Sequence, residues 1–276
     1  MNYTIQKNKI IINNKDEFKP KHIIECGQIF CYKKEDDITY IVYSADKMAK
    51  VKEYETYVEI ETDNTEYFVN YFDLNTNYTE LKNKFINDYP YLTKAINYGT
   101  GIRILKQEPF ETIIGFIISA NNNIKRIQKI MFAIRQTFGK NMGEYYTFPT
   151  AQELSVATEQ DFKNMGAGYR AKYLVEATNQ LVNIDYGILR KMSTDELNKY
   201  LLTIMGVGQK VADCIMLFAF SKGDVFPVDT WIEKVYCSYF EEEHNRTTIR
   251  KNLLNKFGNN SGYIQQYLFY SQRENS

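Results

Sequence analysis

The hydrophobic period changes once along this chain, and that change constrains the fold more than any other feature of the sequence. Before about residue 63, β-branched and aromatic residues form short runs such as Ile10–Ile12, Thr39–Ser44 and Tyr57–Thr62, and the last of these alternates with charges as a half-buried strand does. From about Gly101 onward the period is helical. We therefore expect an α+β protein, in which an antiparallel sheet with one face in water precedes a mostly helical body.

Boundary residues place three of the helices. Pro109–Ile118 starts with a proline suited to the first helical position and continues as an i, i+3, i+4, i+7 apolar stripe. Asn121–Asn123 should break that helix, and Ile124–Gly139 should form the next one. Ser193–Glu196 is a capping box for a third helix, which we expect to end at Gly206. We place the domain boundary after residue 98, between a sheet domain with trailing helices (1–98) and a helical region (99–276).

Composition excludes several classes of protein. No apolar run in the 276 residues approaches the roughly 18–20 residues that span a membrane, and the N-terminus lacks the features of a signal peptide. Four cysteines without Cys-x-x-Cys spacing favour a reduced intracellular setting, either cytoplasmic or associated with the nucleoid. Two histidines exclude a multi-histidine metal site.

The segment Leu201–Asp213 carries the most specific chemical signal. Its Gly206, Val207 and Gly208 fit a tight hairpin between two helices, in which the glycines permit positive φ. Backbone N–H groups at such a turn and at the following helix start can hold a phosphate, often with a backbone-bound cation between them. An ordinary helix corner is the alternative interpretation of a lone Gly-Val-Gly.

Lys210 and Asp229 add chemistry to that hairpin. Lys210 falls in the first turn of a helix, where the dipole disfavours a cation by about 0.3–1 kcal/mol, and partial burial would lower its pKa further. A partly neutral amine can attack a sugar carbon and form a Schiff base. Asp229 is a preferred helix cap that could also steady positive charge on a sugar ring. A solvated lysine and a purely structural cap are the alternatives.

This combination resembles the helix–hairpin–helix (HhH-GPD) DNA glycosylase superfamily. Lys106–Glu111, Ser119–Arg126 and Met165–Tyr173 are similar to segments of 8-oxoguanine DNA glycosylase/AP lyases, and the resemblance runs from about Gly27 to Phe269. It implies two helical subdomains with a DNA cleft between them. It also implies base flipping, excision of 8-oxoguanine opposite cytosine and cleavage of the abasic strand by β-elimination.

The resemblance implies roles for matching residues in the reaction and in the damaged-base pocket. Lys210 would attack C1′ with Asp229 as its electrostatic and acid–base partner. The Gly27 carbonyl would accept the N7–H of 8-oxoguanine, a proton that guanine lacks, so guanine would leave a buried acceptor unpaired. The remaining pocket residues would sandwich the flipped base and contact its Watson–Crick edge; these are Cys214, Phe269 and Gln265.

Other matching residues would replace the flipped base in the duplex. Asn121 would fill the gap and Tyr169 would act as a wedge beside it, which offsets part of the few kcal/mol that flipping costs. Arg126 and Arg170 would read the orphaned cytosine, whose O2 and N3 are acceptors for donor-only guanidinium groups. The hairpin would contact DNA phosphates through Gly206, Val207 and Gly208.

The expected partner is double-stranded DNA that contains 8-oxoguanine, bound by a monomer that does not contact a membrane. Lys plus Arg and Asp plus Glu both number 34, so we expect a confined basic face made by Lys125, Arg126, Arg170 and Lys172. No cofactor is expected, because the four-cysteine iron–sulfur loop of other superfamily branches is missing. Trp231 stands where animal-type members carry a histidine and receives no role. A glycosylase for another damaged base and a non-enzymatic DNA-binding module are the alternative functions.

Overall fold

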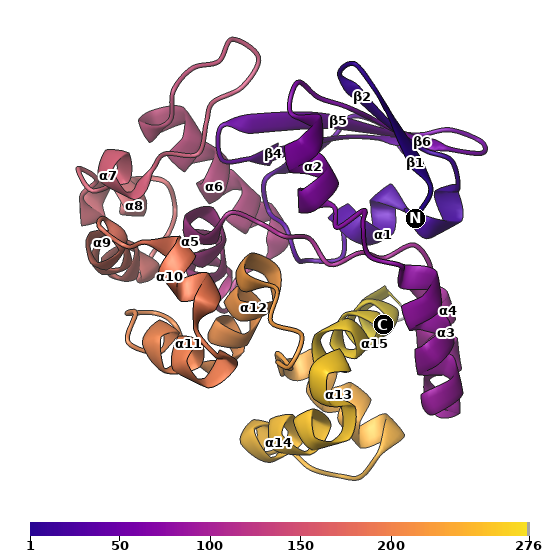
Figure 1. The fold of residues 1–276 in the computed structure, drawn as a ribbon. Coiled ribbons are helices and arrows are strands. Elements are labelled where there is room, and N and C mark those ends of the chain that lie inside the picture. The colour runs from indigo at the N-terminus through magenta and orange to yellow at the C-terminus, as the bar shows by residue number, and fades with distance from the viewer. Residues whose placement is uncertain (275–276) are drawn as a thin grey trace.

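The computed structural model describes residues 1–274 and shows a sheet domain joined to a helical body (Figure 1). The sheet has six antiparallel strands in the order β1-β2-β6-β5-β4-β3, so the expected α+β architecture is confirmed. The strands are β1 (Tyr3–Gln6), β2 (Lys9–Ile12), β3 (Tyr32–Lys34), β4 (Thr39–Ser44), β5 (Lys47–Glu53) and β6 (Val58–Glu61). The sequence predicts β2, β4 and β6 closely; it does not predict β1, β3 and β5.

The inner face of the sheet packs on α1 (Pro20–Ile24) and α2 (Thr65–Tyr71). Along β2 and β6 buried residues alternate with more exposed ones, as expected for a sheet with one wet face. β4 is different, because Tyr43 on its other face packs against Phe132 at a ring distance of 5.6 Å. The expectation of a wet outer face is therefore wrong at β4, where the helical body covers it.

Thirteen further α-helices follow α2 in the described residues, with short 3₁₀ turns at Lys15–Glu17, Pro90–Leu92 and Gly258–Asn260. They are α3 (Tyr78–Asp88), α4 (Thr93–Tyr98), α5 (Pro109–Ser119), α6 (Ile124–Phe138), α7 (Ala151–Leu154), α8 (Glu159–Asn164), α9 (Arg170–Leu181), α10 (Tyr186–Lys191), α11 (Thr194–Leu201), α12 (Gln209–Phe220), α13 (Thr230–Tyr239), α14 (Arg246–Phe257) and α15 (Ser261–Glu274). The expected helices over 109–118 and 124–139 are confirmed. The Ser193 capping box is present, but α11 ends at Leu201 and not at Gly206.

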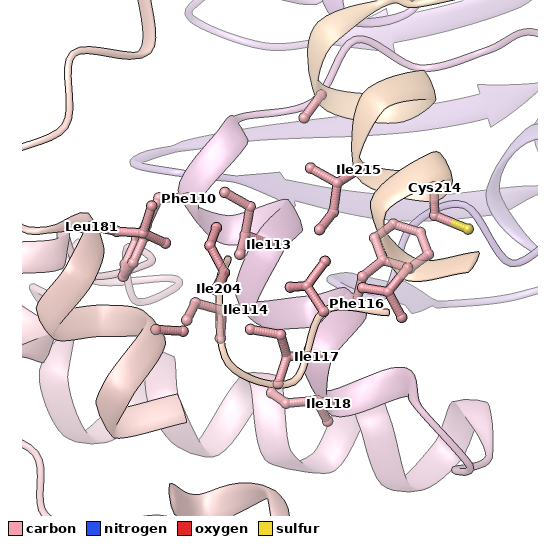
Figure 2. Packing of buried hydrophobic residues seen from close by; sticks show 14 of the residues in the cluster. Phe110, Ile113, Ile114, Phe116, Ile117, Ile118, Leu181, Ile204, Cys214 and Ile215 are labelled. Atoms are coloured by element: carbon pink, nitrogen blue, oxygen red, sulfur yellow. The ribbon is translucent and has the colours of Figure 1, made fainter. Parts of the chain in front are cut away.

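Helix α5 is the centre of the helical body. All of its residues from Pro109 to Ile118 are buried, since α6, α9 and α12 pack around it. Figure 2 shows Leu181 of α9 and Ile215 of α12 beside its side chains. The sequence predicts one buried face for this helix, whereas the structure buries all of its faces. Glu111 is tolerated on this helix because Arg135 of α6, which is 1% exposed, pairs with it at 2.5 Å. That pair fixes α5 to α6, and the C-terminal end of α5 leads directly into the Asn121 loop.

A second helical core lies at the other end of the body. Helices α13, α14 and α15 share one hydrophobic cluster with α3 and α4, whereas α12 belongs to the cluster around α5. Residues 78–98 therefore pack with the C-terminal helices, although they follow the sheet in the sequence. The link between α12 and α13 passes from one core to the other. Lys210 lies in the helix before this link, and Asp229 lies at the start of the helix after it.

Candidate active site

Lys210 lies in the first turn of α12 beside three functional groups. Its amine interacts electrostatically with Cys214, one turn further along, and with the Asp229 carboxylate. Nζ also lies 5.6 Å from the centroid of the Phe116 ring, a cation–π distance. The side chain is neither fully exposed nor fully enclosed. The structure thus brings the predicted nucleophile, its predicted partner and one predicted pocket residue together.

The charge state of Lys210 differs from the expectation. Burial lowers the pKa of the amine, but its interactions with Cys214 and Asp229 outweigh that effect, and the pKa is raised above its ordinary value. Burial also raises the pKa of the Cys214 thiol to about 11. The expectation of a depressed lysine pKa is therefore wrong for the free protein, because it took no account of the interactions of the amine with Cys214 and Asp229. The amine must lose a proton before it can attack.

Asp229 is the N-cap of α13, as predicted. Its Oδ1 accepts hydrogen bonds from the backbone N–H of Trp231 at 2.9 Å and of Ile232 at 3.0 Å. Buried Pro227 and Val228 hold the preceding segment in place. The cap fixes the carboxylate within electrostatic range of Lys210, so the structural and chemical interpretations of this residue are compatible.

The hairpin before α12 turns at one glycine and not at two. Gly206 has φ +88, and a Cβ there would stand 2.9 Å from Cβ of Tyr173, so only glycine fits. Gly208 caps α12 with φ −94 and has no neighbour within 4 Å of a built Cβ. The expectation of positive φ is therefore confirmed for the first glycine and wrong for the second. Val207 is buried and anchors the turn.

A buried ion pair supports the start of α12. Asp213 is completely buried and receives two hydrogen bonds from Arg250 of α14, at 2.6 and 2.8 Å. Gln209 donates a further one at 3.0 Å. This pair joins the two helical cores directly behind Lys210. Sequence reasoning did not find Arg250, because its partner lies 37 residues away and nothing local indicates the contact.

The Gly27 segment is a rigid loop. Gly27 has φ +88, and its neighbours Cys26 and Gln28 are fully buried. The Gln28 side chain donates to the carbonyls of Ile23 at 2.9 Å and Arg103 at 2.8 Å, and it accepts from a backbone N–H at 2.9 Å. The backbone on both sides of Gly27 is therefore held by buried neighbours.

The other pocket residues are only partly brought together. Cε1 of Phe269 lies 3.5 Å from the place of a Cβ on Gly27. Gln265, one turn earlier on α15, is 5% exposed, and its Oε1 has no hydrogen-bond partner in the described structure. Cys214 belongs to the α5 cluster, whereas Phe269 packs with the C-terminal cluster. The two residues expected to sandwich the base thus come from different cores.

Four predicted opposite-base residues meet where the α5–α6 loop approaches the start of α9. Asn121 is exposed and adopts a left-handed conformation with φ +49. Tyr169 is 57% exposed, and its hydroxyl lies 3.5 Å from the Ala120 carbonyl. Arg126 is exposed and donates to the Gly166 carbonyl at 2.8 and 3.2 Å. These three side chains are presented on the surface, as a wedge and gap-filling cluster requires.

Arg170 does not lie on that surface. It is 3% exposed, and its guanidinium donates to the carbonyls of Ala120, Asn121 and Ala167. The expectation that Arg170 forms part of a basic surface is therefore wrong for the free protein. The other three residues of the expected basic face are exposed: Lys125, Arg126 and Lys172. Arg170 instead shapes the Asn121 loop, because it binds two consecutive carbonyls of it.

No group of three or more His, Cys, Asp or Glu side chains in residues 1–274 is arranged to hold a metal ion. Over the same residues, no helix is long and apolar enough to cross a membrane.

A sheet domain, a helical body and a lysine behind a helix–hairpin–helix turn define a class of base-excision DNA repair proteins. This chain belongs to the HhH-GPD superfamily of base excision DNA repair proteins, whose family model matches residues 114–259. The 8-oxoguanine DNA glycosylase N-terminal domain matches residues 10–113.

Individual relatives agree with that assignment. The N-glycosylase/DNA lyase of Saccharomyces cerevisiae is 36% identical over 55% of this chain, and the N-glycosylase/DNA lyase OGG1 of Arabidopsis thaliana is 32% identical over 70% of it. The matches span only 45% and 58% of the length of those proteins. The Clostridium acetobutylicum 8-oxoguanine glycosylase/lyase, solved with double-stranded DNA that contains cytosine opposite 8-oxoG, is 38% identical with a TM-score of 0.93. That similarity covers 100% of this chain and 98% of the other.

Proposed function

We propose that this protein is a bifunctional DNA repair enzyme that excises 8-oxoguanine opposite cytosine and then cleaves the abasic strand. The observation that carries the proposal is the position of the Lys210 amine, which lies beside Cys214 and near the capping carboxylate of Asp229. An amine held near a fixed carboxylate suits Schiff-base chemistry at a sugar carbon. The named activities of the relatives support the same reaction.

Selection of the base follows from the rigid Gly27 loop. A carbonyl with a preset direction accepts a hydrogen bond from the N7–H of 8-oxoguanine, whereas guanine presents a lone pair there. A buried acceptor left unpaired costs about 1–3 kcal/mol, so the loop discriminates against guanine. Gln265 supports this pocket, because its buried Oε1 lacks a partner in the described structure and can accept from the Watson–Crick edge of the base. The ring of Phe269 offers a stacking surface, which is worth about 1–3 kcal/mol for each base.

The reaction then needs a neutral Lys210. After the ammonium loses its proton, Nζ forms a bond to C1′ while the C1′–N9 bond breaks, and the departing base takes up a proton. The Asp229 carboxylate stabilises the positive charge that develops on the sugar. Ring opening leaves an imine between Nζ and C1′. Loss of a C2′ proton then expels the 3′ phosphate, which breaks the strand.

The duplex is held open from the opposite side. Asn121 and Tyr169 occupy the space left by the flipped nucleotide, and Arg126 donates to the acceptors of the orphaned cytosine. Arg170 joins Arg126 at the cytosine only if DNA displaces its contacts with the Ala120 and Asn121 carbonyls. Otherwise it acts through the loop that it holds.

A lesion panel tests the proposed substrate. Duplexes that carry 8-oxoguanine, 3-methyladenine or undamaged guanine opposite cytosine are incubated with the unaltered protein, and released base and cut strand are measured separately. We expect release and cutting with 8-oxoguanine alone. Preferred release of another base would assign the protein to a different glycosylase activity, and DNA binding without any release would favour the non-enzymatic alternative.

A further inference from the structure

We propose that Arg273, in the last turn of α15, is a positioning residue that joins the two walls of the damaged-base pocket and thereby sets its selectivity. The inference rests on the proposed function, since it concerns the pocket for the excised base. One wall is the Glu25–Gly27 segment that follows α1, and the other is the ring of Phe269 on α15. The C-terminal end of α15 lies on the side of the helical body that faces α1 (Figure 1), and the two walls meet there.

Arg273 contacts both walls with one planar group. Its Nη2 donates a hydrogen bond to the Glu25 carbonyl, and its Nη1 lies 3.0 Å from the place where a Cβ on Gly27 would stand. Its Cζ lies 5.7 Å from the centroid of the Phe269 ring, within the range of a cation–π contact. A guanidinium has a rigid fork of donors and a flat face, so it can hold a carbonyl and flank a ring at once, which an ammonium cannot.

The rest of the loop makes this clamp effective. Glu25 is held on its other side, because its carboxylate accepts from the Tyr40 hydroxyl at 2.5 Å and pairs with Lys34 at 3.3 Å. The backbone on both sides of Gly27 is therefore fixed, and Arg273 ties this segment to the Phe269 ring. Loss of that tie changes the spacing between the carbonyl that selects N7–H and the ring on which the base stacks.

The positive charge also acts on the loop itself. Burial raises the pKa of Cys26 and of Tyr32, and the Arg273 charge opposes both shifts. The Arg273 cation thus stands beside a pocket that would hold 8-oxoguanine, a purine with one more carbonyl group than guanine. The sequence did not indicate this residue, because an arginine near the end of a chain carries no local signal.

The test distinguishes an effect on the base pocket from an effect on the reaction of Lys210. Arg273→Met, Arg273→Lys and a control, Arg190→Met, are assayed on a duplex with 8-oxoguanine opposite cytosine and on a preformed abasic site, which needs Lys210 but no base pocket. Arg190 is a matched control, since its guanidinium also donates to a carbonyl, that of Ala219 at 2.9 Å, and also lies 5.7 Å from a phenylalanine ring.

We expect Arg273→Met to lower single-turnover excision of 8-oxoguanine by about tenfold or more, while cleavage of the abasic site stays within about twofold. Arg273→Lys should fall between Met and the unaltered protein, and Arg190→Met should change neither activity. Equal loss of both activities would show general damage and overturn the proposal, as would unchanged excision in Arg273→Met. Failure of the unaltered protein to excise 8-oxoguanine would instead reject the proposed function, and this inference with it.

Discussion

Replacement of Arg250 by methionine should destabilise the protein strongly and in a pH-dependent way. The change leaves Asp213 completely buried without the partner that gives it hydrogen bonds of 2.6 and 2.8 Å. Breaking a buried pair from one side costs about 3–5 kcal/mol. The Arg250 side chain is 23% exposed, so water can reach the site, and we expect the lower end of the range, about 3 kcal/mol.

The pH dependence follows from the carboxylate. Burial already raises the pKa of Asp213, and Arg250 opposes that shift, so removal of Arg250 raises the pKa further. Above the pKa of the unfolded chain, the folded variant then binds more protons than the unfolded one, and the free energy of unfolding falls as pH rises. The loss of stability should therefore be larger at about pH 7 than at about pH 5.

Urea unfolding at both pH values measures these differences. The control is Arg246→Met on the same helix, because the ion pair of Arg246 with Glu233 is more exposed and should contribute less than about 1 kcal/mol. A loss below about 1 kcal/mol for Arg250→Met at neutral pH, or the same loss at both pH values, would refute the reasoning.

Three further predictions concern the reaction and its selectivity. Asp229→Asn keeps the cap acceptor, so urea unfolding should change by less than about 1 kcal/mol, whereas base excision should fall by about 10²–10⁴ if the carboxylate assists the reaction; unchanged excision would leave only the capping role. Arg126→Ala should lower the ratio of excision opposite cytosine to excision opposite adenine by about tenfold. The free energy of unfolding should fall by less than about 1 kcal/mol, because the side chain and its hydrogen bonds to the Gly166 carbonyl are exposed. The pKa of Lys210 is raised, and only the neutral amine attacks. At pH values below that pKa, the single-turnover excision rate should therefore increase by about tenfold for each unit of increasing pH. A rate that falls with rising pH would contradict this.

Local patterns predicted the elements whose signals are contained in their own residues. Thr39–Ser44 is a strand over the predicted residues, Pro109 begins α5, and Ser193 caps α11. The charged strand Lys47–Glu53 was missed, because its pairing with two neighbouring strands and not its own composition makes it a strand. The complete burial of α5 was also missed, since it depends on three helices that come later in the chain.

In the candidate site too, local sequence predicted some features, and others depend on tertiary contacts. The residue types and spacing identified Lys210 and Asp229, and the fold brings them close together. The pKa direction at Lys210 was wrong because the interactions of the amine with Cys214 and Asp229 outweigh the effect of burial, and the position of Asp229 relative to the amine is set by the fold. The burial of Arg170 could not be predicted either, because it depends on the Ala120 carbonyl, 50 residues distant in the sequence. Burial and charge state thus depend on tertiary contacts that the motifs do not specify.

Borohydride trapping tests the central claim most directly. The unaltered protein and Lys210→Gln are each incubated with a duplex that carries one 8-oxoguanine opposite cytosine, and sodium borohydride reduces any imine to a stable amine. Our account predicts a covalent protein–DNA adduct with the unaltered protein and none with Lys210→Gln. Release of the base without an adduct, or an equal adduct with Lys210→Gln, would contradict the assignment of Lys210 as the nucleophile.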